Sequence, residues 1–231
     1  MNADERLIVA LDLPTADDAL RLVDRLASQV GFFKVGSQLF TAAGPDIVRA
    51  LVARNQKVFL DLKYHDIPNT VAAAVKSAAG LGVSLLTLHG LGGRAMLEAA
   101  AGARPDGPLR LLAVTVLTSH DEASLADIGL AGPLSDSVRR LARLARDAGI
   151  DGVVASPLEA RLLREACGKG FLIVTPGVRP AGAQAGDQSR LATPAGALSA
   201  GADYLFVGRP DIEAPDPAAA VAAIVQDMKS G

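Results

Sequence analysis

The sequence has no tryptophan and few aromatic residues of any kind. Aromatic residues make up 3% of the 231 residues, whereas 50% of the residues are hydrophobic. A chain of this size can bury a substantial core, which must consist mainly of Val, Leu, Ile and Ala. Such a core is typical of a buried parallel sheet covered by Ala-rich helices.

The sequence also has only one cysteine, Cys167, which excludes an internal disulfide and a cysteine metal cluster. Cys167 lies in an apolar helical pattern, so we expect a buried or half-buried thiol and not a nucleophile. No apolar run is long enough to span a membrane, and the N-terminus is polar, unlike a signal peptide. We therefore expect a cytoplasmic protein.

Two kinds of binding motif are missing. The net charge is −2, with no basic tract and no alternation of aromatic and basic residues, so a nucleic-acid surface is not indicated. No Gly-x-Gly-x-x-Gly motif follows the first apolar run, where Leu11-Asp12-Leu13-Pro14 stands instead. This weakens the prediction of a dinucleotide-binding fold.

Eight short apolar runs alternate with stretches of helical periodicity. The first five runs begin about 25 to 27 residues apart, which is the rhythm of a (β/α)8 barrel. We therefore predict an α/β fold, with one TIM-barrel domain over residues 1–231; a doubly wound open sheet is the alternative. The predicted strands are Leu7–Leu13, Phe32–Gly36, Val58–Leu62, Leu85–His89, Leu111–Leu117, Gly152–Ala155, Phe171–Thr175 and Tyr204–Gly208. The clearest predicted helices are Ala16–Gln29, Asp46–Arg54, Val71–Ala79, Ser135–Ala148 and Pro157–Ala166, with N-caps at Thr15 and Ser156; Thr193 is expected to cap a further helix.

Charged residues mark the ends of the first three predicted strands. Alternate residues of a strand share a face, so Asp12, Lys34 and the pair Asp61 and Lys63 fall on faces opposite to purely apolar ones. In a barrel these faces point inward and meet at the C-terminal mouth, where active sites of this fold lie. Because the charges are of mixed sign, they can be buried together. The alternative is that Asp61 and Lys63 form a salt bridge at the end of their strand that has only a structural role.

Two further strand ends indicate a phosphate site. The seventh predicted strand runs into Gly177-Val178-Arg179, and the eighth runs into Gly208-Arg209. Barrels often bind phosphate at these two loops, where glycine lets backbone N–H groups approach and arginine supplies a fork of donors. The long stretch Arg179–Ala192 has the length of a lid.

The three histidines are His65, His89 and His120. A metal site of His and Asp ligands is conceivable. However, Lys34 and Lys63 would bring positive charge to the place of a metal ion. We therefore expect no metal.

The chain resembles a known family over essentially its whole length. The main motif is Asp-x-Lys-x-x-Asp, present as Asp61, Lys63 and Asp66 and followed by Ile67-Pro68-Asn69-Thr70. Supporting segments are Ala10-Leu11-Asp12, Lys34-Val35-Gly36, Val116-Leu117-Thr118-Ser119, Thr175-Pro176-Gly177-Val178-Arg179-Pro180, Gly186-Asp187-Gln188 and Val207-Gly208-Arg209-Pro210. Together they resemble the orotidine 5′-phosphate decarboxylase family, of the bacterial type.

This resemblance implies a cofactor-free decarboxylation of orotidine 5′-monophosphate to uridine 5′-monophosphate in de novo pyrimidine biosynthesis. Lys63 would donate a proton to C6 of the pyrimidine, within a charged network of Asp61, Lys34 and Asp66. The resemblance also implies a homodimer in which Asp66 and Thr70 reach the partner subunit's site. The substrate contacts it implies are Asp12 and Lys34 at the ribose, Thr118 and Ser119 at the base, and Arg179, Gln188, Gly208 and Arg209 at the phosphate.

Three other functions remain as alternatives. A 3-keto-gulonate-6-phosphate decarboxylase shares the Asp-x-Lys-x-x-Asp motif but would require magnesium and matches the other segments less well. A ribulose-phosphate epimerase would need metal-binding histidines where Lys34 and Lys63 stand. A non-catalytic nucleotide-binding barrel would be expected to have lost some of the four charges, and all four are present.

Overall fold

Eight parallel strands close into a barrel in the computed structural model, which describes residues 2–130, 132–178 and 192–230. Each strand pairs with the next along the chain, and β1 pairs with β8. This confirms the predicted TIM barrel and excludes the open sheet. The strands are β1 Leu7–Ala10, β2 Phe32–Gly36, β3 Lys57–Tyr64, β4 Leu85–His89, β5 Arg110–Val114, β6 Gly152–Val154, β7 Leu172–Thr175 and β8 Tyr204–Val207.

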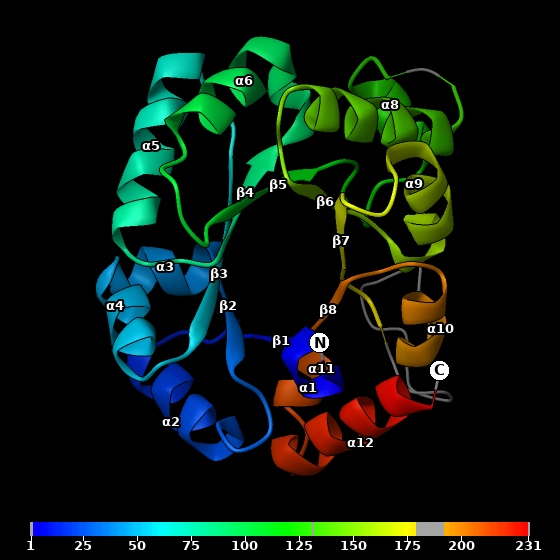
Figure 1. The fold of residues 1–231 in the computed structure, drawn as a ribbon. Coiled ribbons are helices and arrows are strands. Elements are labelled where there is room, and N and C mark those ends of the chain that lie inside the picture. Colours follow the sequence, from blue (N-terminus) through cyan, green and yellow to red (C-terminus); the bar gives the residue numbers. More distant parts are fainter. Residues whose placement is uncertain (1, 131, 179–191, 231) are drawn as a thin grey trace.

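Helices surround the strands as an outer ring (Figure 1). The helices are α1 Ala3–Arg6, α2 Ala16–Leu26, α3 Ser37–Ala43, α4 Asp46–Ala53, α5 Pro68–Gly80, α6 Gly93–Ala103, α7 Glu122–Asp127, α8 Leu134–Asp147, α9 Ala160–Cys167, α10 Pro194–Ser199, α11 Arg209–Ile212 and α12 Pro217–Lys229, with 3-10 turns at Gly90–Gly92 and Pro157–Glu159. The side chains of Thr15, Ser156 and Thr193 accept hydrogen bonds from backbone N–H groups of the turns that follow, which confirms the predicted caps. No helix among these residues is long and apolar enough to cross a membrane.

Two apolar layers lie on the two faces of the strands. The outer layer, between strands and helices, is mainly aliphatic, as the composition predicts. The layer inside the barrel differs, because it holds half of the eight aromatic residues of the chain: Phe32, Phe59, Tyr204 and Phe206. Phe32 packs edge-on against Tyr204 and Phe59 against Phe206, with ring centroids 5.8 and 6.0 Å apart. An eight-stranded barrel has an interior that side chains fill, and these rings supply much of that volume.

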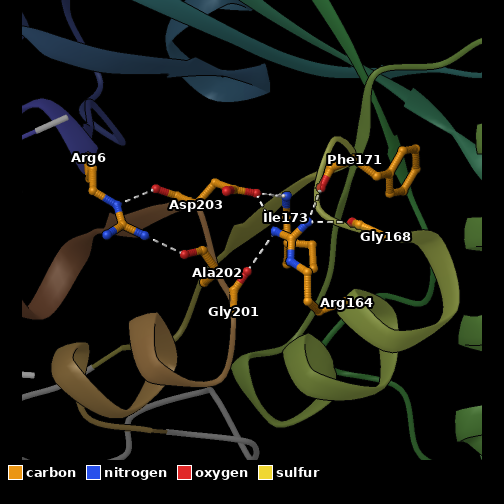
Figure 2. A network of polar contacts seen from close by, with 8 residues as sticks. All are labelled: Arg6, Arg164, Gly168, Phe171, Ile173, Gly201, Ala202 and Asp203. Atoms are coloured by element: carbon orange, nitrogen blue, oxygen red, sulfur yellow. Dashed lines mark hydrogen bonds and ion pairs between the residues drawn. The ribbon is translucent and has the colours of Figure 1, made fainter.

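A polar clamp joins the segments that enter β7 and β8, at the end of the barrel opposite the mouth (Figure 2). Asp203 accepts hydrogen bonds at Oδ2 from the Ile173 backbone N–H, at 2.8 Å, and from Arg164, at 2.7 Å. Arg164 also donates to three backbone carbonyl groups: those of Gly168, Phe171 and Gly201. Gly201 has φ +109, and a Cβ there would lie 3.2 Å from Arg164 Cβ, so glycine suits this turn.

The same device recurs two strands earlier. Asp151, which directly precedes β6, accepts from the Leu111 N–H at 2.8 Å and is paired with Arg104. In both places an aspartate at the start of an even-numbered strand fixes the preceding odd-numbered one. The lower rim of the barrel is therefore held by charged side chains that take no part in lining the mouth.

We predict that Arg164→Ala destabilises the fold without altering the chemistry at the mouth. The substitution removes four hydrogen bonds of a charged donor, and a bond of this kind typically contributes about 1.5–3 kcal/mol net of its exchange with water. Because the four bonds share one side chain and their contributions are not additive, we expect a loss of about 2–3 kcal/mol in the free energy of unfolding by urea. The control is Arg49→Ala, which removes an exposed pair with Asp46 worth at most about 1 kcal/mol. Equal effects of the two substitutions would contradict the clamp.

Candidate functional site

Four charged side chains meet at the mouth of the barrel. Lys34 Nζ lies 3.0 Å from Asp12 Oδ1 and 3.6 Å from Asp61 Oδ2. Lys63 Nζ lies 2.9 Å from Asp61 Oδ1. The four charges therefore form one chain from Asp12 to Lys63, so they converge as the sequence predicts; what each does in binding or catalysis stays a prediction.

Asp61 and Lys34 are the buried members of this chain, with 6% and 5% of their surface exposed. Burial is the largest influence on the pKa of Asp61 and by itself would raise it. The charges of Lys34 and Lys63, with hydrogen bonds from Lys63 and Thr87, outweigh burial and hold the pKa of Asp61 below its ordinary value. The carboxylate is therefore ionised at neutral pH and keeps both lysines close.

Lys63 reaches the site through an irregularity in β3. Pairing with β4 passes from Leu60–Leu86 directly to Tyr64–Leu88, so β3 advances four residues while β4 advances two. Lys63 has φ +51, in the left-handed region that costs a non-glycine residue roughly 1–2 kcal/mol. The simple alternation predicted from the sequence thus ends at Asp61, and a bulge at Lys63 aims its side chain.

Thr87 is a member of the site that the sequence reasoning missed. It lies on β4, is fully buried, and its hydroxyl donates to Asp61 Oδ1 at 3.0 Å. The Thr87 hydroxyl oxygen in turn accepts a hydrogen bond from the Lys63 backbone N–H at 2.9 Å. The signal was available in principle, because Leu85, Thr87 and His89 alternate with Leu86 and Leu88, which makes Thr87 the polar inward residue of an apolar strand.

Gly36 leaves room for the charges, and Gly208 lies next to them. A Cβ at Gly36 would lie 3.0 Å from Lys34 Nζ and 3.2 Å from Asp12 Oδ1, closer than side chains normally approach. A Cβ at Gly208 would lie 3.7 Å from Asp12 Oδ2, so Gly208 stands beside the same aspartate. The end of the first predicted strand thus lies beside the end of the eighth, because β1 and β8 are paired.

A cavity of about 180 Å³ opens above the charged chain. Asp61 and Lys63 form its charged wall, and Thr118 contributes a hydroxyl-bearing side chain. The rest of the lining is apolar: Val114, Val116, Leu117, Val154, Ala155, Pro176 and Phe206. An ammonium group beside a low-dielectric wall can stabilise negative charge that develops on a bound molecule and can give that molecule a proton.

A larger hollow of about 580 Å³ lies at the other end of the barrel, beside Cys167. Its arginines are engaged, Arg146 with Asp147 and Arg110 with Asp151. Burial raises the pKa of the Cys167 thiol, so the thiolate is disfavoured at neutral pH, in line with the expected inert cysteine.

The histidines gather at the mouth without forming a metal site among the described residues. The rings of His65 and His89 stack with centroids 5.3 Å apart. Burial, and then the neighbouring His65, Lys63 and His120, lower the pKa of His89, so its ring is neutral at pH 7. His89 Nδ1 accepts a hydrogen bond from the Leu91 backbone N–H, which fixes the loop after β4.

The structure does not bring every predicted site residue into this cavity. Asp66 is exposed, accepts from the Ile67 N–H at 2.6 Å, and forms no ion pair with any described cation. Thr70, in the first turn of α5, and Ser119 are also exposed. Arg209 is exposed at the start of α11, while Arg179 and Gln188 lie outside the described residues. Val178 and Ala192, on either side of those residues, form a parallel bridge.

Comparisons with known proteins agree over nearly the full chain. A family model described as the orotidine 5′-phosphate decarboxylase / HUMPS family matches residues 5–224. Orotidine 5′-phosphate decarboxylase of Halorhodospira halophila is 58% identical over 225 residues, covering 96% of this chain and 95% of that relative. The enzyme of the same name from Alkalilimnicola ehrlichii is 56% identical over 226 residues, covering 96% of both chains. The crystal structure of orotidine 5′-phosphate decarboxylase from Lactobacillus acidophilus superposes with a TM-score of 0.86 at 40% identity, covering 97% of this chain and 99% of that one. The chain therefore belongs to the orotidine 5′-phosphate decarboxylase / HUMPS family.

Proposed function

We propose that this protein is a carboxy-lyase that converts orotidine 5′-monophosphate to uridine 5′-monophosphate in pyrimidine biosynthesis, with Lys63 as proton donor to C6. The observation that carries the proposal is the Lys63 ammonium, held 2.9 Å from the buried Asp61 carboxylate on the wall of the mouth cavity. Relatives more than half identical to this chain carry the name of this activity. They favour it over the 3-keto-gulonate-6-phosphate alternative.

The chemistry requires an electrostatic solution. When the bond between C6 and the carboxylate breaks, carbon dioxide leaves and the electron pair stays on C6, with little resonance to spread it. The Lys63 ammonium stabilises that charge and then donates a proton to C6, after which water returns a proton to the amine. Asp61 next to the substrate carboxylate would repel it, and the repulsion ends when carbon dioxide departs.

The rest of the substrate is held away from the reacting carbon. Asp12 and Lys34 bind the ribose hydroxyls, and Thr118 and Ser119 lie by the base. Arg179, Gln188, Gly208 and Arg209 bind the phosphate. Binding energy from this remote grip assembles the charged site around C6.

No metal or other cofactor takes part in this proposal. Lys34 and Lys63 already place two positive charges against Asp61. A divalent cation at the same place would meet both ammonium groups. The positive charge that the reaction needs therefore comes from side chains.

The active unit is a homodimer in which Asp66 and Thr70 complete the partner subunit's site. Asp66 is exposed and has no cationic partner among the described residues. This is expected of a residue whose partner lies on a second subunit. Large apolar side chains are exposed on the connections that follow β3, β4 and β5: Ile67, Leu91 and Ile128, with 67%, 38% and 53% of their surface exposed. Such a set at one end of a barrel suits contact with a second copy.

The protomer is one domain over residues 1–231, and its cytoplasmic location stays a prediction.

We predict that Lys63→Ala lowers kcat/KM for orotidine 5′-monophosphate by about 10²- to 10⁴-fold or more, the usual contribution of a positioned proton donor. The substitution leaves the barrel folded, because Lys63 lies at the rim. Turnover is followed in the presence of EDTA as the decrease in the ultraviolet absorbance of the substrate. The control is Lys169→Ala, which removes an exposed lysine away from the mouth. Near-normal turnover by folded Lys63→Ala would rule out the role. A wild-type rate that collapses in EDTA and returns with magnesium would instead favour the keto-gulonate reaction.

We expect mixed dimers of two inactive variants to regain activity. In a dimer of one Asp66→Ala and one Lys63→Ala subunit, one site contains both defects and the other contains neither. We expect each hybrid dimer to turn over at up to half the wild-type rate. The rate is measured after the subunits are mixed, and native mass spectrometry verifies that the hybrid has formed. Verified hybrid dimers that stay inactive would contradict the shared-site model.

Arg209→Ala tests the phosphate grip. A charge-assisted hydrogen bond is typically worth about 1.5–3 kcal/mol, so we expect a fall in kcat/KM of roughly 10- to 200-fold on the nucleotide. The slow reaction of phosphate-free orotidine should not change, and the exposed Arg161→Ala should affect neither substrate. Equal damage to nucleotide and nucleoside would mean that Arg209 acts on folding or on the base.

A further inference from the structure

Thr87 places a hydroxyl group at a fully buried position of the barrel, where apolar side chains are the rule. It lies in the middle of β4, is fully buried, and faces the barrel interior between Leu86 and Leu88, which face the helices. A buried hydroxyl without hydrogen bonds is costly. Thr87 meets this cost by joining two residues of the neighbouring strand, Asp61 and Lys63.

The two hydrogen bonds have a fixed direction. An ionised carboxylate can only accept, so the Thr87 hydroxyl donates its single proton to Asp61 Oδ1. Its lone pairs then accept from the Lys63 backbone N–H. Lys63 Nζ donates to the same Asp61 oxygen at 2.9 Å. Both ends of Lys63, backbone and ammonium, are thus tied to one oxygen atom, directly at one end and through Thr87 at the other.

The irregular strand explains why Lys63 needs this support. The jump in register between β3 and β4 takes Lys63 out of the regular ladder, and its backbone is left-handed. A buried backbone N–H outside the ladder needs another acceptor. The Thr87 hydroxyl is that acceptor and stands on the strand against which the bulge forms.

We infer that Thr87 is a positioning residue for decarboxylation, which holds Lys63 in its bulged conformation and orients the Asp61 carboxylate toward it. The inference rests on the proposed role of Lys63 as proton donor. Thr87 itself does not line the mouth cavity, so it acts through Asp61 and Lys63.

Two pairs of variants isolate the hydroxyl group. Thr87 and Thr87→Val have nearly the same shape, and Thr87→Ser differs from Thr87→Ala by one oxygen atom. We expect kcat on orotidine 5′-monophosphate to fall by about 10- to 100-fold in the Val and Ala variants, as for loss of a hydrogen bond to a charged group, with KM little changed. Thr87→Ser should recover most of kcat. Because the hydroxyl helps to lower the pKa of Asp61, the acid limb of the pH profile of kcat/KM should move to higher pH in the variants that lack it.

The control is Thr175→Val. Thr175 is a buried threonine on β7 whose hydroxyl has no hydrogen-bond partner among the described residues, so its loss should leave kcat and the pH profile unchanged. If the Val and Ala variants keep the wild-type kcat and pH profile, or if Ser is as slow as Ala, Thr87 only fills space and the inference is wrong. Lys63→Ala, assayed in parallel, separates this failure from that of the proposed function. An active Lys63→Ala would overturn both, whereas an inactive Lys63→Ala with normal Thr87 variants would overturn the positioning role alone.

Discussion

The arrangement of the mouth depends on one buried carboxylate, that of Asp61. A charge with 6% of its surface exposed is tolerated only if donors surround it, and three side chains do so: Lys34, Lys63 and Thr87. These come from β2, from the bulge of β3 and from β4, so the three strands must pair in one register for the charge to be satisfied. Asp12, in turn, balances Lys34 from beyond β1.

The two ends of the barrel use charge for different purposes. At the mouth, charged groups face one another around a cavity, and the bulge at Lys63 is an unfavourable conformation retained by its partners. At the opposite rim, Asp151 and Asp203 bind backbone N–H groups and arginines, and they hold consecutive strands together. This division suits a barrel whose catalytic groups lie on the C-terminal side of the strands, where loops can change while the lower rim keeps the strands in place.

The interior of the barrel connects these two ends. Its aromatic rings form two edge-on pairs, Phe32 with Tyr204 and Phe59 with Phe206, and Phe206 also lines the cavity. Lys34 Nζ lies 5.9 Å from the centroid of the Phe206 ring, so the inner apolar layer directly contacts the charged side chains of the mouth. An apolar support of this kind lowers the local dielectric constant and strengthens electrostatic interactions above it, which is what the loss of carbon dioxide from C6 requires.

The sequence by itself determined the order and place of the eight strands, the inward face of the first three and the four charges that meet at the mouth, because these follow from periodicities within single segments. Its motifs also indicated the family. Only the tertiary structure decided the bulge at Lys63, the role of Thr87 as its backbone partner and the gathering of scarce aromatic rings inside the barrel. The reason is that these features depend on the register between strands about 25 residues apart and on the volume that barrel closure leaves to be filled, which no pattern within one segment encodes.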